Sequence, residues 1–166
     1  MTRRLLWTDD DDPFQFVYET HILQRAGWEI QWARDVQQGA EMLRDARFDA
    51  LVLDQHMPFD SQHSKEIPPP LRIWGGCLLL WWLRCQRWPD DAPYAPAISA
   101  SPIWQWSPSP SNNDLPVIMV SAYYDEEVER IIQSASSIDR DLEILTKPLR
   151  LPDLQDFLAP LTEATP

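Results

Sequence analysis

The sequence predicts an α/β fold in which helices cover both faces of a parallel sheet, and three observations favour it. Short apolar runs of strand length alternate with segments whose apolar residues recur at helical spacing. The runs at residues 50–53 and 116–120 contain no polar residue, which is typical of strands buried on both faces. Several of these runs end abruptly in a polar or charged residue, as the third does at Asp54.

The first two strands and the helix between them follow from local signals. Residues 4–8 contain the apolar run Leu5-Leu6-Trp7 and predict a strand before four aspartates. Pro13 suits the first helical position, with Asp12 as its cap. The helix is expected to end at Gly27. Its apolar residues at helical spacing are Phe14, Val17, Tyr18, Ile22 and Leu23. Alternation of Trp28, Ile30 and Trp32 predicts the second strand.

The remaining elements continue the alternation of strand and helix. Helices are expected at residues 36–47, 77–88, 125–136 and 151–161. Strands are expected at residues 50–54, at 116–120 before Ser121, and at 142–145 before Lys147. The last helix should face inward through Leu154, Phe157, Leu158 and Leu161.

Composition excludes several classes of function. With 166 residues we expect one domain, residues 1–166, and the net charge of −12 argues against binding to nucleic-acid phosphates. Cys77 and Cys85 would lie about 12 Å apart on one helix, too far for a disulfide, so reduced thiols are expected. No signal peptide is evident, and the longest apolar run, residues 77–83, is too short to span a bilayer. We therefore expect a cytoplasmic protein that binds neither membrane nor nucleic acid.

Polar residues follow four of the five expected strands. Asp9 and Asp10 follow the first strand, and Asp54, Ser121 and Lys147 follow the third, fourth and fifth. Because parallel strands end at one edge of a sheet, these side chains should converge there. Ligands bind at this edge in open α/β sheets, so the sequence predicts a functional site at these residues.

Four motifs together resemble those of the receiver domains of response regulators in two-component signalling. They are the acidic cluster after the first strand, Leu53-Asp54 with Met57-Pro58, Val120-Ser121-Ala122, and Thr146-Lys147-Pro148. Their order and approximate spacing match those of the family, and together the motifs cover about residues 3–58 and 114–161. The resemblance implies a flavodoxin-like, doubly wound sheet of five βα units with strand order 2-1-3-4-5.

The resemblance also implies a role for each site residue. Asp54 would accept a phosphoryl group from a sensor histidine kinase or a phosphotransfer protein. Mg²⁺ would be held by Asp9, Asp10, Asp54 and the backbone carbonyl of His56. Lys147 and the Ser121 hydroxyl would contact phosphoryl oxygens, and the Lys147–Pro148 peptide would be cis. The chain would then be a phosphoacceptor in signalling rather than an enzyme acting on a separate substrate.

The acidic cluster leaves the metal-binding pair open, because it holds one aspartate more than the family pattern needs. Counting from the strand gives Asp9 and Asp10, whereas counting back from Pro13 gives Asp10 and Asp11. We favour Asp9 and Asp10, since sheet register fixes a strand end more firmly than a loop fixes a proline. Asp11 and Asp12 are then interpreted as helix-capping residues.

Two further departures concern residues beside the site. The fifth strand carries Ile144 where receiver domains usually carry a switching Tyr or Phe, so aromatic switching is not expected there. Gln55 and His56, which follow Asp54, could affect how a hydrolytic water approaches the phosphoryl group.

The region between the third and fourth strands is enlarged. It contains 57 residues, including six of the nine tryptophans and nine prolines, with extra chain at about 59–74 and 89–113 around the helix. The helix expected at 77–88 carries apolar residues on almost every side of its first two turns. The sheet can cover only one of its faces, so another part of the protein or a partner must cover the other. Either the insertion folds back over it, or the helix and insertion form a surface for a partner or a second copy in a homodimer.

These features lead to two hypotheses of different class. The first is a stand-alone receiver that signals through protein–protein contact after Mg²⁺-dependent phosphorylation of Asp54. The alternative is a phosphorylation-independent, receiver-like scaffold that binds its partner through the tryptophan-rich insertion. A small flavodoxin-like enzyme is disfavoured, because four aspartates stand where a glycine-rich phosphate loop would be needed.

Overall fold

A five-stranded parallel sheet forms the centre of the molecule. The computed structural model describes residues 2–59, 75–84, 102–122 and 142–163. The strand order is β2-β1-β3-β4-β5. The strands are β1 (Arg3–Thr8), β2 (Trp28–Ala33), β3 (Ala50–Asp54), β4 (Val117–Ser121) and β5 (Glu143–Thr146). All neighbouring strands are parallel, so the predicted fold class and strand order are confirmed.

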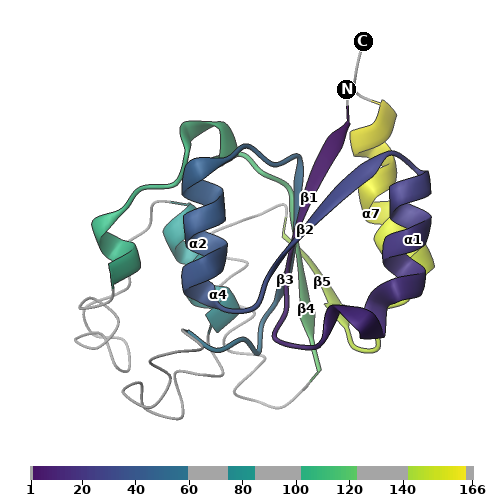
Figure 1. Ribbon diagram of the computed structural model, residues 1–166, viewed down its shortest axis with the longest axis horizontal. Helices are drawn as coiled ribbons and strands as arrows, with labels where there is room; N and C mark the ends of the chain where they lie inside the picture. The colour runs from purple at the N-terminus through teal and green to yellow at the C-terminus, as the bar shows by residue number, and fades with distance from the viewer. Residues whose placement is uncertain (1, 60–74, 85–101, 123–141, 164–166) are drawn as a thin grey trace.

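Helices cover both faces of this sheet, as Figure 1 shows. α1 (Val17–Arg25) and α7 (Leu151–Glu163) lie on one face, and α2 (Val36–Asp45) and α4 (Gly75–Leu83) lie on the other. Successive strand residues alternate between the two resulting cores. The central strands β3 and β4 are buried at every residue, as their apolar sequences predict.

The predicted elements outside this frame have different outcomes. The helix expected at residues 125–136 lies outside the described residues. In α7, Leu154 and Leu158 are buried as predicted. Among the described helices, none combines the length and apolar character needed to cross a bilayer.

The start of the first helix differs from the prediction. Residues Pro13–Phe16 form a 3₁₀ turn, η1, and the α-helix begins only at Val17. Three residues of the expected apolar face are exposed by more than half: Phe14, Val17 and Tyr18. A 3₁₀ turn has three residues per turn, so it shifts the buried face along the sequence. Phe16 packs inward instead, with its ring 5.1 Å from that of Trp7.

The apolar helix α4 is buried and contacts the described part of the insertion. All nine of its residues are buried. The insertion contributes two 3₁₀ turns, η2 (Pro102–Gln105) and η3 (Pro110–Asn112). Trp82 Nε1 donates hydrogen bonds to the carbonyls of Ile103 at 2.8 Å and Trp106 at 3.1 Å. Residues 102–115 therefore fold back onto α4, whereas 60–74 and 85–101 lie outside the described residues.

Asn112 fastens this segment to the end of α2. Its amide nitrogen donates to the carbonyls of Leu43 and Ala46, both at 2.7 Å, and its Oδ1 accepts from the backbone N–H of Phe48 at 3.0 Å. The Asn112 side chain is fully buried. It satisfies carbonyl groups that the end of a helix would otherwise leave without partners.

Substitution of this residue should be costly. Asn112→Ala removes three hydrogen bonds, two of them fully buried, and should lower the free energy of unfolding by about 2–4 kcal/mol, measured by urea denaturation. Ser111→Ala is the matched control, because the Ser111 hydroxyl forms an exposed hydrogen bond with the Ser109 hydroxyl at 2.9 Å. Equal effects of the two substitutions would contradict a fastening role for Asn112.

Candidate functional site

The carboxyl ends of four strands bring the predicted site residues to one edge of the sheet. Thr8 pairs in register with Leu53, and Asp54 pairs with Val120. Asp9 follows directly after β1, and its N–H continues the ladder by donating to the Ala33 carbonyl at 3.0 Å. Sheet register, rather than loop conformation, therefore places Asp9 beside Asp54.

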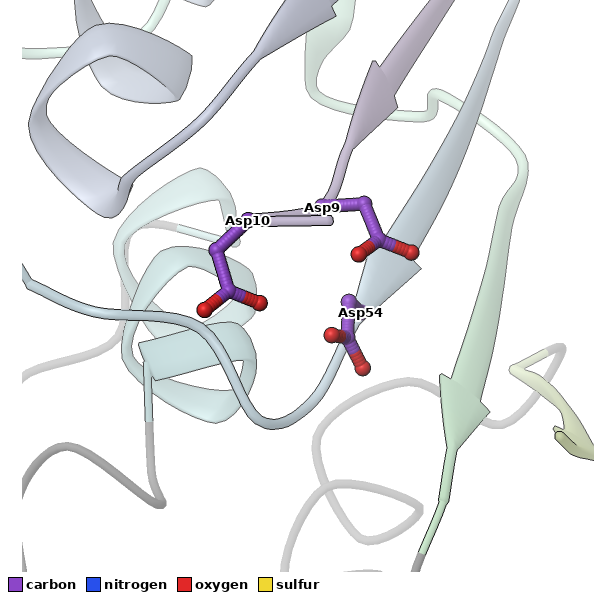
Figure 2. Close-up of side chains that lie close together, drawn as sticks. All are labelled: Asp9, Asp10 and Asp54. Atoms are coloured by element: carbon purple, nitrogen blue, oxygen red, sulfur yellow. The ribbon is translucent and has the colours of Figure 1, made fainter. Parts of the chain in front are cut away.

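Three carboxylates at this edge form a cluster suited to a metal ion. Asp9, Asp10 and Asp54 each offer an oxygen atom, and these atoms lie within 4.8 Å of one another. Figure 2 shows Asp9 and Asp10 on the segment after β1 and Asp54 at the end of β3. Asp9 and Asp54 are only 2% exposed, whereas Asp10 is open to solvent. An all-oxygen donor set with one solvent-facing side fits Mg²⁺, which prefers carboxylates and retained waters.

Lys147 enters the same cluster from the segment after β5. Its Nζ lies 3.1 Å from carboxylate oxygens of Asp9 and of Asp54. The Lys147 backbone N–H donates to the Ser121 carbonyl at 2.7 Å, which extends the pairing of β4 with β5. Ser121 is 3% exposed at the end of β4. The Lys147–Pro148 peptide is cis, as the sequence resemblance implied.

Burial and like charge shift the acid–base properties of this cluster. Burial, reinforced by the neighbouring Asp9 carboxylate, raises the pKa of Asp54 to about 6 despite the attraction of Lys147. Burial also raises the pKa of Asp9. For Lys147, burial alone would lower the pKa, but the carboxylates of Asp54 and Asp9 outweigh it and raise the pKa overall. The site thus holds more negative charge than Lys147 balances.

Comparison with known proteins gives matches in structure but not in sequence. No protein-family model matches the sequence, and no curated protein is significantly similar to it. The receiver domain of the Francisella response regulator 1452 superposes with a TM-score of 0.60 and 20% identity over 99% of each chain. A receiver domain of a Pseudomonas aeruginosa sensor histidine kinase, with magnesium coordinated in its active-site cleft, matches with a TM-score of 0.59 and 15% identity over 99% of this chain and 100% of that one.

A third match is a Burkholderia pseudomallei response regulator with a phosphorylated aspartic acid, a calcium ion and citrate. It has a TM-score of 0.56 and 14% identity over 97% of this chain and 69% of that one. The chain has the receiver-domain fold. The resemblance first drawn from four short motifs thus extends to the whole described architecture.

One residue of this receiver fold was assigned wrongly from the sequence. Asp11, interpreted as a capping residue, places its Oδ2 3.1 Å from Lys147 Nζ. Asp12 is the cap, because its side chain accepts from the Phe14 N–H. The interpretation failed because Asp11 N–H donates to Asp9 Oδ1, which turns the chain back over the site before the helix begins.

Two glycines that support the candidate site were also missed. A Cβ on Gly75 would overlap the Met57 carbonyl oxygen, and one on Gly76 would overlap the Asp54 carbonyl oxygen. The Gly76 N–H donates to the Gln55 carbonyl at 3.1 Å. Helix α4 therefore begins directly against the backbone that carries Asp54, and glycine is required for that approach. The adjacent glycines before an apolar helix were the signal in the sequence.

His56 contributes through its backbone in the described contacts. Its N–H donates to Asp54 Oδ1 at 3.2 Å, while the residue itself is exposed. This hydrogen bond lowers the pKa of Asp54, although burial and Asp9 prevail. The predicted role of the His56 carbonyl as a metal ligand stays a prediction.

The charge imbalance predicts how stability depends on pH. Because the folded state raises the pKa of Asp54 from 3.8 to about 6, folded protein binds this proton more tightly than unfolded protein. Without divalent cations, stability should therefore fall as pH rises from about 4 to about 6. At pH 7, Asp54→Asn should raise the free energy of unfolding by about 1–3 kcal/mol and remove that part of the pH dependence.

Urea denaturation in a chelator at several pH values measures this effect. Asp45→Asn is the matched control, because Asp45 is exposed beside Arg44, which lowers its pKa. A pH profile for Asp54→Asn that parallels the wild-type profile would contradict the prediction.

Proposed function

We propose that the chain is a single receiver domain in which Asp54 accepts a phosphoryl group from a histidine kinase or a phosphotransfer protein. The observation that carries this proposal is the contact of a buried Asp54 carboxylate with Lys147, beside two further acids at the carboxyl edge of the sheet. A nucleophile, a cation for the transferred group and metal-binding oxygens are together in one place. This is the set of groups that phosphoryl transfer to a carboxylate requires.

Asp54 supplies the nucleophile in the proposed step. One of its carboxylate oxygens forms a bond to phosphorus as the P–N bond of a phosphohistidine breaks. The imidazole leaves with the electron pair of that bond and takes a proton from solvent. The product is an acyl phosphate on Asp54. With a pKa of about 6, Asp54 is mostly ionised at neutral pH and is therefore competent to attack.

Asp9, Asp10 and Asp54, with the backbone carbonyl of His56, would hold Mg²⁺. When bound, the ion neutralises the negative charge of the phosphoryl group beside these carboxylates. Three oxygen atoms within 4.8 Å of one another support the assignment, and so does the site's excess of negative charge. The carboxylates whose oxygens lie this close together include those of Asp9 and Asp10, which favours this pair over Asp10 and Asp11 as metal ligands.

Lys147 and Ser121 would bind the transferred group. The Lys147 ammonium already lies 3.1 Å from the Asp54 carboxylate, so it can pair with a phosphoryl oxygen attached there. Ser121 stands at the end of the neighbouring strand β4, where its hydroxyl would donate to another phosphoryl oxygen. The signal would pass onward through contact with another protein.

Phosphorylation itself is the first test. Incubation with a small-molecule acyl phosphate and Mg²⁺ should add the mass of one phosphoryl group, detected by mass spectrometry of the intact protein. Asp54→Asn should abolish the adduct, and the exposed control Asp45→Asn should keep it. If wild-type protein forms no adduct at saturating Mg²⁺, the proposed function is wrong and the phosphorylation-independent scaffold becomes the better hypothesis.

The role of Lys147 has its own test. Lys147→Gln removes a charge-assisted hydrogen bond to the phosphoryl group, so affinity for beryllofluoride, a phosphoryl mimic, should fall about tenfold or more. Tryptophan fluorescence at saturating Mg²⁺ measures this binding. Arg150→Gln is the matched control, because it removes an exposed positive charge close in sequence that pairs with Asp153. An unchanged affinity for Lys147→Gln would rule out the role.

A further inference from the structure

Asp11 contacts the site but has no part in the proposed chemistry. Its Oδ2 lies 3.1 Å from Lys147 Nζ, the same distance as the nearest oxygens of Asp9 and Asp54. It lies outside the Asp9, Asp10 and Asp54 cluster that could hold a metal. Within the described part of the chain, its carboxylate forms an ion pair with Lys147 alone.

These contacts use the full donor capacity of the lysine. A lysine ammonium has three N–H donors and no acceptor. Three carboxylates stand within ion-pairing distance of Lys147 Nζ, one for each donor. A phosphoryl oxygen can therefore gain a hydrogen bond from Lys147 only if one of these carboxylates gives up its own.

Asp11 is the carboxylate that leaves most easily. Its side chain is 43% exposed, whereas those of Asp9 and Asp54 are 3% and 2% exposed. An exposed carboxylate regains hydration when it leaves, but a buried one would remain in the interior without a cation. Asp9 and Asp54 are also the residues that the proposed metal site and acyl phosphate require.

The backbone keeps Asp11 beside the lysine. Its N–H donates to Asp9 Oδ1 at 3.0 Å. The next residue, Asp12, caps η1 with its own side chain, so the chain on both sides of Asp11 is anchored. Asp11 therefore stays near Lys147 even when its carboxylate exchanges partners.

We propose that Asp11 is a positioning residue that competes with the phosphoryl group for Lys147 and thereby limits phosphorylation of Asp54. This inference rests on the proposed function and adds a control to the same site. Asp11 holds the ammonium toward the acidic cluster before transfer and must release it afterwards. Its charge also opposes the incoming anion, because three carboxylates already pair with one ammonium group and the Asp10 carboxylate lies close to two of them.

The proposal predicts different effects of Asp11→Asn on the affinities for the two ligands of the site. Asp11→Asn frees one donor of Lys147 and removes one negative charge. Affinity for beryllofluoride at saturating Mg²⁺ should rise about three- to tenfold, and phosphorylation by an acyl phosphate should accelerate by a similar factor. Affinity for Mg²⁺ alone should stay equal or fall, because a cation loses an attracting charge. If Asp11 had a purely structural role, its substitution would not raise the affinity for beryllofluoride while leaving the affinity for Mg²⁺ unchanged or lower.

Tryptophan fluorescence titrations of Mg²⁺ and then beryllofluoride provide the measurement, with the phosphorylation rate followed by intact mass. Asp12→Asn is the matched control, since it removes the same charge one residue away and contacts the Phe14 N–H rather than Lys147. Asp11→Glu keeps the charge and should stay within about twofold of wild type.

The outcomes separate this inference from the proposed function. If wild-type protein binds no beryllofluoride, the proposed function fails and this inference fails with it. If wild-type protein binds it and Asp11→Asn binds equally or more weakly, only the inference about Asp11 is wrong. An equal gain from Asp12→Asn would also overturn it, because the effect would then come from net charge and not from Lys147.

Discussion

Two carboxylates buried side by side, Asp9 and Asp54, impose the constraint on which the site depends. Burial raises the pKa of both carboxylates, and the charge of Asp9 raises the pKa of Asp54 further. Lys147 offsets part of this cost but cannot balance two or more acids. A fold that retains such a cluster is less stable than it would be with neutral groups there. The same excess of negative charge would attract the divalent cation of the proposed function, so the loss of stability and that function would have one cause.

The sheet withstands this repulsion because backbone hydrogen bonds continue beyond the strand ends. Asp9 N–H donates to Ala33, Gln55 N–H to Val120 and Lys147 N–H to Ser121, each to a backbone carbonyl of a neighbouring strand. The charged side chains therefore project from backbone that is already paired. Their relative positions follow from parallel register, and movement of one would break ladder bonds rather than merely bend a loop.

The sequence predicted those parts of the structure that a strand end determines. Asp9, Asp54, Ser121 and Lys147 converge because apolar runs locate the ends of parallel strands and parallel strands end at one edge. The prediction for Asp11 was wrong, because the position of this residue depends on one hydrogen bond to Asp9 and not on any periodic pattern. The predicted buried face of the first helix was wrong for a similar local reason. A single 3₁₀ turn at its start changes which apolar residues are buried, although their spacing in the sequence still resembles that of an α-helix.

The enlarged region between β3 and β4 is compatible with this site because α4 is held at both ends. At its start, Gly76 N–H bonds to Gln55, and the two glycines allow the helix to meet the backbone of Asp54. At its end, the Arg84 guanidinium donates to the carbonyls of Asn113 and Leu115 just before β4. Chain added on either side of α4 need not alter these contacts, and lengthening a connection adds only a slowly growing entropic cost. The insertion can therefore vary in length and sequence while Asp54 keeps its surroundings.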